Sequence, residues 1–358
     1  MNDRDYMKRA MDLAKKGRGR VSPNPLVGAL LVKDGKIIGE GYHRAYGKYH
    51  AERDAISRAT EDVAGATLYC NLEPCSHYGK QPPCADLLIE KNIKRVVISN
   101  LDPNPKVSSI DKLREAGIEV DVGLLADKGK RLNEVFFFNM EHKRPLVALK
   151  YAMTLDGKIA SGKYDSKWIS NDKSRKFVHK LRHRYDAILV GKNTAMTDNP
   201  RLTARIKGGV DPIRIIVDTN LDIDPKLEIF KENTDGKTYL ATTSSKERRE
   251  VNAGIIRCKD KDGRVDLEDL LDRLYDMNIS SVLVEGGSLI NNAFLEAGLV
   301  DKIYEFISPK VISGKDSRSP FIGRGVDEIK DAYRFEIKKV KTFGEDIMIE
   351  ANNVYRNS

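Results

Sequence analysis

The stretch His50-Ala51-Glu52, followed by Pro74-Cys75, eight further residues and Cys84, decides the fold of the first half of this chain. One imidazole and two thiols are ligands that zinc accepts in proteins, and three protein ligands leave a fourth position for water. A carboxylate, Glu52, stands two residues after the imidazole. The stretch therefore predicts a zinc site held by His50, Cys75 and Cys84, with Glu52 beside it as a proton carrier.

A His/Cys/Cys zinc site with a glutamate that is not a ligand is typical of zinc deaminases. Zinc lowers the pKa of its bound water to about 7, and Glu52 can pass the proton of that water to a departing amine. The cysteine spacing differs from the usual two intervening residues, because a polar loop, 76–83, separates the thiols. Such a loop can also hold substrate. The alternative is that Cys75 and Cys84 are metal-free core residues.

Length and composition predict two α/β domains of ordinary size in a soluble, cytoplasmic protein. The chain has 358 residues, of which 40% are hydrophobic and 32% charged, and it contains no apolar run of membrane-spanning length. Two of the four cysteines are assigned to zinc, so we expect Cys70 and Cys258 to be buried thiols. The net charge of +9 fits nucleic acid or anionic small molecules such as phosphates, but Lys and Arg form no dense block.

The first half alternates predicted strands and helices, which indicates an α/β layer fold. Zinc ligands at the starts of successive helices place the site at one edge of the sheet. Two prolines fix the backbone around Asn24, and we favour a substrate contact for it over a turn role. The expected strands are 26–32 and 36–41, joined by a turn at Asp34-Gly35, then 67–72, 94–99 and 118–122, and the expected helices are 6–16, 51–59, 85–91 and 111–116.

A short charged segment ending at Pro145 marks the domain boundary, and a second α/β domain follows it. Gly286-Gly287 lies between a strand and a helix, where backbone N–H groups favour phosphate. No G-x-G-x-x-G follows the first strand of this domain, so a Rossmann fingerprint is absent. The expected strands are 146–152, 187–190, 213–217, 238–242, 254–257, 281–284 and, as the last regular element, 302–307; the expected helices are 172–184, 267–277 and 289–297.

The first half resembles the deaminase domain of the bifunctional deaminase/reductase family of riboflavin biosynthesis. The motifs that carry the resemblance are Ser22-Pro23-Asn24-Pro25-Leu26-Val27-Gly28, His50-Ala51-Glu52, Glu73-Pro74-Cys75-Ser76-His77, Pro82-Pro83-Cys84 and Asp102-Pro103-Asn104-Pro105-Lys106-Val107. The resemblance implies a cytidine-deaminase-like, three-layer domain over residues 1–144. It also implies that the pyrimidine and its phosphoribosyl group are surrounded by Asn24, His43, His77, Asp102 and Asn104. The segment after Val107 is about two residues shorter than the family pattern. If this segment closes over the phosphate, either the substrate affinity differs or the closure is built otherwise.

The second half resembles the reductase domain of the same family, through Leu149-Lys150, Thr154-Leu155-Asp156-Gly157, Trp168-Ile169-Ser170, Asp198-Asn199-Pro200 and Val284-Glu285-Gly286-Gly287. This implies a dihydrofolate-reductase-like domain over residues 145–358 that uses NADPH. By motif position, the cofactor is lined by Ala152, Thr154, Trp168, Ser170, Thr194, Asp198, Thr219, Gly286, Gly287 and Ser288. The substrate is held by Lys150, Ser166, Arg182, Leu202, Arg205 and Glu285.

Some of these roles have alternatives in the sequence. Arg182 and Arg205 suit a phosphate because guanidinium binds it bidentately, but they can also be surface charges. Trp168 can be a core residue. Lys150 either orients the ribosyl hydroxyls or assists proton transfer. Asn220-Leu221-Asp222 stands where relatives often carry Arg, which bears on the preference for the 2′-phosphate of NADPH.

The whole chain is thus predicted to be a bifunctional, zinc- and NADPH-dependent enzyme of riboflavin biosynthesis. It deaminates a small phosphoribosyl pyrimidine, reduces the ribosyl side chain to ribityl, needs neither nucleic acid nor membrane, and forms a dimer or tetramer. The main alternative is a tRNA deaminase with a fused binding domain, which predicts strongly salt-sensitive RNA binding. A structural zinc protein, or a protein with one active domain, are further alternatives.

Overall fold

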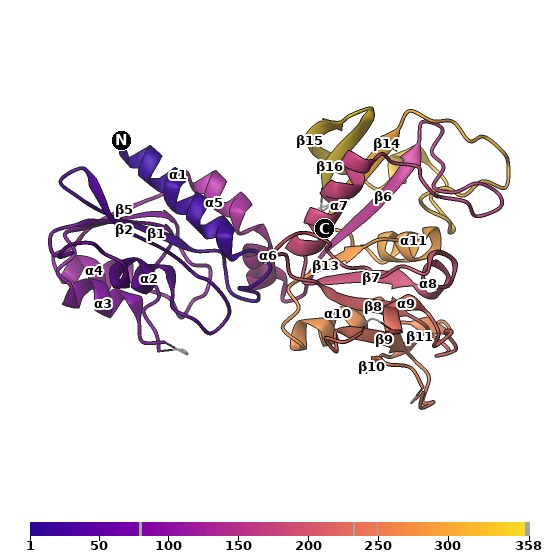
Figure 1. Cartoon of the computed structure of the whole chain (residues 1–358), viewed down its shortest axis with the longest axis horizontal. Helices are drawn as coiled ribbons and strands as arrows, with labels where there is room; N and C mark the ends of the chain where they lie inside the picture. Colours follow the sequence, from indigo (N-terminus) through magenta and orange to yellow (C-terminus); the bar gives the residue numbers. More distant parts are fainter. Residues whose placement is uncertain (79–80, 232, 249, 355–358) are drawn as a thin grey trace. The chain divides into compact units, whose positions relative to one another are not determined.

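The computed structural model describes residues 1–78, 81–231, 233–248 and 250–354, which fold into two compact units, residues 1–143 and residues 144–358 (Figure 1). Among the described residues, no helix has both the length and the apolar character needed to cross a membrane.

The first unit is built on a five-stranded sheet with the order β2-β1-β3-β4-β5. Strands β3, β4 and β5 run parallel, and β1 pairs antiparallel with both β2 and β3. Asp34 and Gly35 join β1 to β2 with positive φ at both residues, as a tight hairpin requires. The strands are β1 (Gly28–Lys33), β2 (Lys36–Tyr42), β3 (Thr67–Leu72), β4 (Arg95–Asn100) and β5 (Glu119–Val122).

Helices cover both faces of this sheet, because successive residues of each strand point to opposite faces. In β1, Ala29 and Leu31 pack in one core with residues of α2, α3 and α4, whereas Leu30 and Val32 pack on the other face with α1. Figure 1 shows the sheet between these two helical layers. The predicted three-layer arrangement is confirmed. The helices are α1 (Asp3–Ala14), α2 (Ala51–Ser57), α3 (Cys84–Glu90), α4 (Ile110–Glu115), α5 (Ala126–Leu132) and α6 (Glu134–His142), with a 3₁₀ turn at Lys15–Gly17.

The second unit contains a nine-stranded sheet with the order β10-β9-β8-β7-β13-β6-β14-β16-β15. All neighbours from β10 to β14 are parallel, and β16 and β15 continue the sheet in antiparallel pairing. The strands are β6 (Leu146–Thr154), β7 (Ala187–Gly191), β8 (Ile213–Val217), β9 (Thr238–Thr242), β10 (Gly254–Arg257), β13 (Ser281–Val284), β14 (Lys302–Ser308), β15 (Phe335–Phe343) and β16 (Asp346–Asn353), and a separate small sheet contains β11 (Asp260–Lys261) and β12 (Arg264–Val265).

The core of the second unit lies where α10 and α11 pack on one face of this sheet, around Leu149, Leu189 and Phe294. On the other face, Phe177 of α7 contacts Phe306 of β14 and Phe343 of β15. The helices are α7 (Asp172–Arg184), α8 (Lys192–Asp198), α9 (Glu228–Lys231), α10 (Leu267–Asp276) and α11 (Ser288–Glu296), with a 3₁₀ turn at Ile329–Asp331.

The expectation that 302–307 is the last regular element is wrong, because β15 and β16 follow it as an antiparallel hairpin. The pairing register shifts between Ile337 and Lys339, so the alternation of apolar and polar residues is broken within β15. Most of β15 is also exposed, with Ile337 and Val340 on the surface. The sequence of β15 therefore shows neither a sustained alternation of apolar and polar residues nor an apolar run, the two patterns that predict a strand.

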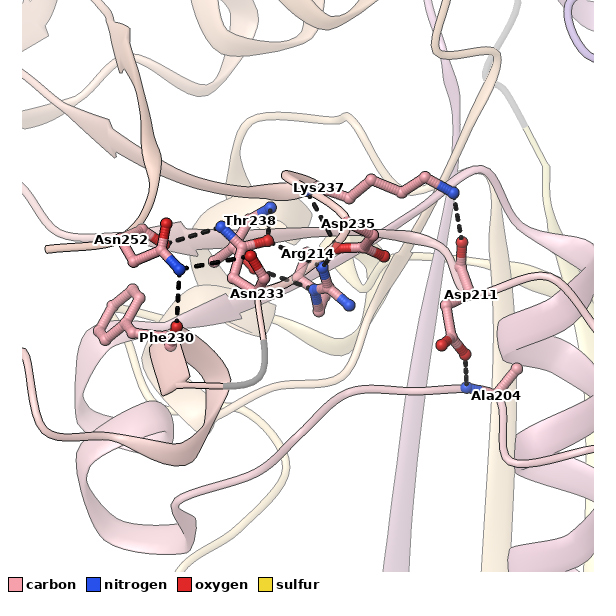
Figure 2. A network of polar contacts seen from close by, with 9 residues as sticks. All are labelled: Ala204, Asp211, Arg214, Phe230, Asn233, Asp235, Lys237, Thr238 and Asn252. Carbon is pink, nitrogen blue, oxygen red and sulfur yellow. Dashed lines mark hydrogen bonds and ion pairs between the residues drawn. The ribbon is translucent and has the colours of Figure 1, made fainter.

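A polar network around Arg214 holds β8 to β9 and to the segment before β9 (Figure 2). Arg214 is only 3% exposed and donates to Thr238 Oγ1 at 2.9 Å, to Asn233 Oδ1 at 3.1 Å and to the carboxylate of Asp235. Nearby, Asp211 Oδ1 accepts the backbone N–H of Ala204 at 2.7 Å. The same region therefore anchors the segment that carries Leu202 and Arg205.

Replacing Arg214 with methionine is expected to destabilise the second unit by about 3 kcal/mol, because it removes the buried cation that pairs with Asp235 and the hydrogen bonds to Asn233 and Thr238. Urea denaturation followed by circular dichroism measures this free energy. Lys231→Met is the control, since Lys231 and Glu228 form an exposed pair that contributes at most about 1 kcal/mol. Equal midpoints for the two variants would contradict a stabilising role for the network.

Candidate active sites

The three predicted zinc ligands converge at one edge of the first sheet. His50 directly precedes α2, Cys75 follows β3, and Cys84 is the first residue of α3. His50 Nδ1 lies 3.4 Å from Cys75 Sγ and 3.6 Å from Cys84 Sγ, and all three donor atoms lie within 4.8 Å of one another. The predicted placement at successive helix starts is confirmed.

Backbone contacts hold these ligands in place. A Cβ added to Gly41 of β2 would lie 2.2 Å from the backbone N of Ala55, so α2 packs against the sheet at a distance that only glycine permits. The N–H of Cys84 donates to Cys75 Sγ at 3.3 Å. Hydrogen bonds from Cys84 and His50 lower the pKa of the Cys75 thiol to about 4, so that the thiolate needed for metal binding forms readily. A neutral imidazole and two thiolates suit zinc.

Glu52 lies on the first turn of α2 and is 3% exposed. Among the described residues, its Oε2 has no hydrogen-bond partner, although it is fully buried. Burial raises the pKa of its carboxyl to about 7. A buried carboxylate oxygen that is free to bind a reacting molecule fits the role of a proton carrier beside the metal ligands.

A cavity of about 300 Å³ opens onto the zinc ligands. It brings together all the residues that the sequence predicted for the deaminase substrate, together with others that it did not single out. The predicted lining residues are Asn24, His43, His77, Asp102 and Asn104, and the additional ones include Tyr46, Lys48, Glu73, Gln81 and Phe136.

Asn24 and His43 form a pair on the cavity wall. His43 Nδ1 lies 3.0 Å from the carbonyl oxygen of Tyr49, which can only accept, so Nδ1 carries the proton. His43 Nε2 then accepts from Asn24 Nδ2 at 3.1 Å. Burial lowers the pKa of His43, which keeps the ring neutral. The amide oxygen of Asn24 therefore remains available to a ligand donor.

Asp102 and Asn104 lie in the loop between β4 and α4. Asp102 Oδ1 accepts the N–H of Asn104 at 2.8 Å, and Asn104 Oδ1 accepts the N–H of Lys106 at 3.1 Å. Burial raises the pKa of Asp102 to about 6. His77 is half-buried, and its Nδ1 has no partner among the described residues. Of the predicted substrate loop 76–83, Gly79 and Lys80 lie outside the described residues.

In the second unit, four of the predicted residues form one charged cluster near the carboxyl ends of β6 and β13. Arg182 of α7 donates to both carboxylate oxygens of Glu285, at 2.7 and 2.8 Å, and the two side chains are 13% and 7% exposed. Burial alone would raise the pKa of Glu285, but Arg182 outweighs it and lowers the pKa to about 2. Lys150 and Asp198 interact electrostatically with each other beside this pair. Arg182 is therefore no surface charge.

The residues at the turn from β13 to α11 fit a phosphate-containing cofactor. Gly287 precedes α11 and provides no side-chain cap, so the first N–H groups of this helix are free of a capping side chain. A Cβ on Gly287 would lie 3.0 Å from Thr194 Oγ1. The carbonyl of Gly286 accepts the N–H of Gly191, which brings the carboxyl end of β7 to the same place. Ser288 uses its hydroxyl within the protein, donating to the carbonyl of Ser319 at 2.5 Å.

The segment between β6 and α7 carries Ser166, Trp168 and Ser170. Trp168 is 62% exposed and stacks on the guanidinium of Arg175, so the core interpretation is wrong. Its carbonyl accepts Lys310 Nζ at 2.6 Å. Ala152 and Thr154 lie at the end of β6. The Thr154 hydroxyl donates to Asp156 Oδ1 at 2.6 Å.

The remaining predicted residues of the second unit lie on two loops. Leu202 is buried, whereas Arg205 is exposed and donates to Thr203 Oγ1 at 3.3 Å. The carbonyl of Thr203 accepts Arg182 Nη1 at 3.2 Å, which ties this loop to the charged cluster. Thr219 follows β8, and its carbonyl accepts the Thr242 hydroxyl at 2.8 Å.

Comparison with known proteins gives the same two-part division. Residues 1–100 match the family described as the cytidine and deoxycytidylate deaminase zinc-binding region, and residues 145–349 match the RibD C-terminal domain. The riboflavin biosynthesis protein RibD of Actinobacillus pleuropneumoniae is 44% identical over 357 residues, which is 98% of this chain and 95% of that protein. RibD of Aquifex aeolicus is 42% identical over 97% of each chain.

Solved structures agree over the full length. The crystal structure of a diaminohydroxyphosphoribosylaminopyrimidine deaminase/5-amino-6-(5-phosphoribosylamino)uracil reductase from Thermotoga maritima is 42% identical, with a TM-score of 0.87 over 98% of this chain and 99% of that one. RibD from Acinetobacter baumannii is 32% identical, with a TM-score of 0.89 over 99% of each chain.

The fold and the two sites define a bifunctional enzyme, with a zinc-binding domain of the cytidine-deaminase type followed by a reductase domain of the dihydrofolate-reductase type. The chain belongs to the RibD family of riboflavin biosynthesis proteins, as the full-length identities show. The alternative of a tRNA deaminase with a fused binding domain is not favoured, because the second half is a RibD reductase domain.

The Arg182–Glu285 pair predicts a characteristic pH dependence of stability. The pKa of Glu285 is lowered from 4.5 to about 2 in the folded chain, so its contribution is complete above pH 4.5 and is lost as the pH falls toward 2. Arg182→Met leaves a buried carboxylate unpaired, and we expect a loss of about 3 kcal/mol at neutral pH. This difference from wild type is expected to shrink as the solution is acidified, which urea titrations at several pH values measure.

The control is Arg9→Met on α1, where Arg9 pairs with Glu40 and the two side chains are 53% and 31% exposed. Its effect is expected to stay below about 1 kcal/mol and to change little with pH. A loss for Arg182→Met that remains constant down to acidic pH would contradict the assignment of the shift to this pair.

Proposed function

We propose that residues 1–144 form the deaminase domain and residues 145–358 the reductase domain of an enzyme that acts on diaminohydroxyphosphoribosylaminopyrimidine. The first domain replaces the ring amino group with oxygen and releases ammonia. The second reduces the ribosyl side chain of the deaminated product, 5-amino-6-(5-phosphoribosylamino)uracil, to ribityl. The observation that carries this proposal is the cluster of His50, Cys75 and Cys84 at a cavity lined by His50, Cys75 and Glu52, in a chain similar over 98% of its length to a protein with those two activities.

In the deaminase domain, His50, Cys75 and Cys84 would hold one zinc ion. When bound, zinc supplies the Lewis acidity that makes water a nucleophile at neutral pH. Glu52 accepts a proton from the attacking water through its free Oε2 and donates it to the departing amine, so that ammonia leaves and the ring carbon gains the oxygen. The amide oxygen of Asn24, together with Asp102 and Asn104, holds the pyrimidine and its phosphoribosyl group.

In the reductase domain, NADPH would bind across Gly286, Gly287 and the start of α11, next to Thr194. When bound, the cofactor would supply the hydride for C1′ of the sugar, and the residues of this chain would supply placement and electrostatics. The remaining proposed cofactor residues are Ala152, Thr154, Trp168, Ser170, Asp198, Thr219 and Ser288.

The charged cluster of the reductase domain would hold the substrate. Burial lowers the pKa of Lys150, opposed by Glu285, so this ammonium is suited to orienting ribosyl hydroxyls or assisting proton transfer. Arg182 pairs with Glu285, and Arg205 lies on the loop that Arg182 contacts through Thr203, so we propose that both guanidinium groups contribute to the phosphate site. Ser166 and Leu202 complete the proposed substrate contacts.

We also propose that the enzyme works in the cytoplasm as a homo-oligomer, either a dimer or a tetramer. Support for assembly comes from β15, a nine-residue edge strand on which Ile337 and Val340 are each 59% exposed. Edge strands with exposed apolar residues pair readily with another chain. Light scattering on the purified protein measures its mass, and a monomer at micromolar concentration would contradict the proposal.

The two-site proposal predicts that Glu52→Gln abolishes ammonia release and leaves the reduction of pre-deaminated substrate intact. Glutamine cannot carry the proton, so we expect a fall in deaminase kcat of roughly 10²–10⁴-fold or more. Ammonia release and NADPH oxidation are measured together, and zinc content is measured on the same samples. Wild-type ammonia release without NADPH oxidation would contradict the reductase role of the second domain.

Removing zinc with a chelator tests the same separation of the two activities as Glu52→Gln. It is expected to stop ammonia release and to leave NADPH oxidation on the pre-deaminated substrate unchanged, because the ligands lie in the first domain only. Full deaminase activity of the Glu52→Gln variant with zinc bound would instead support a structural zinc site.

A further inference from the structure

Glu73 is a buried carboxylate that the chemistry described above does not use. It follows β3 immediately, precedes Pro74-Cys75, is 7% exposed and lines the cavity next to the zinc ligands. A buried carboxylate is costly unless it is paired or hydrogen-bonded. Its partners therefore show what it does.

Among the described residues, the donors to the Glu73 side chain lie at the two ends of one loop, residues 102–109, between β4 and α4. Oε2 accepts the backbone N–H of Asp102 at 3.2 Å. Oε1 accepts both the backbone N–H of Ser109, at 2.8 Å, and its hydroxyl, at 3.0 Å. One carboxylate thus closes this loop at its start and at its end.

The use of the Ser109 hydroxyl is informative. Ser109 occupies the position before α4, where serine usually caps the helix with its side chain. Here it makes no capping hydrogen bond, and its hydroxyl points to Glu73 instead. The Ser109 hydroxyl therefore binds the loop to Glu73 and does not cap α4.

A second connection runs between the same two segments. Ser76, the residue after Cys75, accepts the backbone N–H of Ser108 with its Oγ at 2.8 Å and lies 3.5 Å from the carbonyl of Lys106. Glu73 and Ser76 therefore flank the zinc ligand Cys75 on both sides and both bind the loop. That loop carries Asp102 and Asn104 on the cavity wall.

We propose that Glu73 is a positioning residue of the deaminase, which fixes the loop 102–109 so that Asp102 and Asn104 face the substrate. This inference rests on the proposed deaminase function. Ser108 and Ser109 lead directly into α4, and Glu73 provides the closure that this short connection needs.

A change of one atom in the side chain of Glu73 tests the proposal. Three donors converge on its two oxygens, and both oxygens act as acceptors. In glutamine one oxygen is replaced by an NH₂ donor, which would face an N–H of Asp102 or the donors of Ser109. Glu73→Gln therefore releases one end of the loop while it keeps the size of the side chain.

The experiment is the rate of ammonia release as a function of substrate concentration for wild type, Glu73→Gln and Ser109→Ala, each with its zinc content. We expect KM of Glu73→Gln to rise about tenfold and KM of Ser109→Ala about threefold, in proportion to the hydrogen bonds lost. Zinc content and kcat are expected to change less than about twofold. The rate of NADPH oxidation on pre-deaminated substrate should be unchanged.

Hydrogen exchange gives a second readout that does not depend on turnover. The amides of Asp102 and Ser109 are expected to exchange faster in Glu73→Gln, because both donate to this carboxylate in the wild type. Glu90→Gln is the control, since Glu90 lies at the exposed end of α3 and pairs only with the neighbouring Lys91 among the described residues.

Unchanged KM and unchanged exchange in Glu73→Gln would overturn the proposal. Loss of zinc with unaltered KM would also overturn it, because Glu73 would then support the metal ligand and not the loop. If Glu73→Gln does not fold, Ser109→Ala decides, and an unaltered KM for that variant counts against the proposal. Absence of ammonia release from the wild type would instead contradict the proposed deaminase function.

Discussion

Parallel pairing of neighbouring strands is the constraint on which both sites depend. Parallel strands end at the same edge of a sheet, and ligands of open α/β sheets bind beyond those ends. In the first unit, β3 and β4 pair in parallel, with Leu72 opposite Asn100, so the segment with Cys75 and the segment with Asp102 leave the sheet side by side. In the second unit, β13 and β7 end while β6 continues, and the register places Glu285 and Gly191, where those two strands end, near Lys150 in the middle of β6.

The two sites differ in how their buried charged groups are balanced. In the deaminase domain, His50 and Cys84 stand at helix starts, Cys75 follows β3, and the carboxylates of Glu52 and Glu73 are buried beside them. One of these, Glu52, keeps an oxygen free for chemistry, whereas the other is saturated with hydrogen bonds. In the reductase domain, the charges are compensated within the protein, because Arg182 pairs with Glu285 and Lys150 interacts with Asp198.

Contacts that lie outside the two sites also help to place the residues within them. The Arg214 network lies beyond the reductase residues, yet it holds β8 and β9 together next to the hydrogen bond that fixes the loop carrying Leu202 and Arg205. Likewise α2 brings His50 to Cys75 and Cys84 only because Gly41 lets the helix backbone approach the sheet. Such supporting contacts determine whether a correct set of residues is also correctly placed.

From the sequence alone we predicted His50, Cys75 and Cys84 as zinc ligands with Glu52 beside them, and the order of most strands and helices; the structure brings the three ligand side chains together. These features are local: His50 and Cys84 stand at helix starts, and buried parallel strands read as continuous apolar runs. Only the tertiary structure decided that Arg182 and Glu285, 103 residues apart, neutralise each other, that Trp168 is exposed, and that Glu73 closes the 102–109 loop. The β15–β16 hairpin was also missed, because a register shift and exposure removed its pattern. Pairings between distant residues depend on how strands are ordered in the sheet, and that order leaves no periodic trace in the sequence.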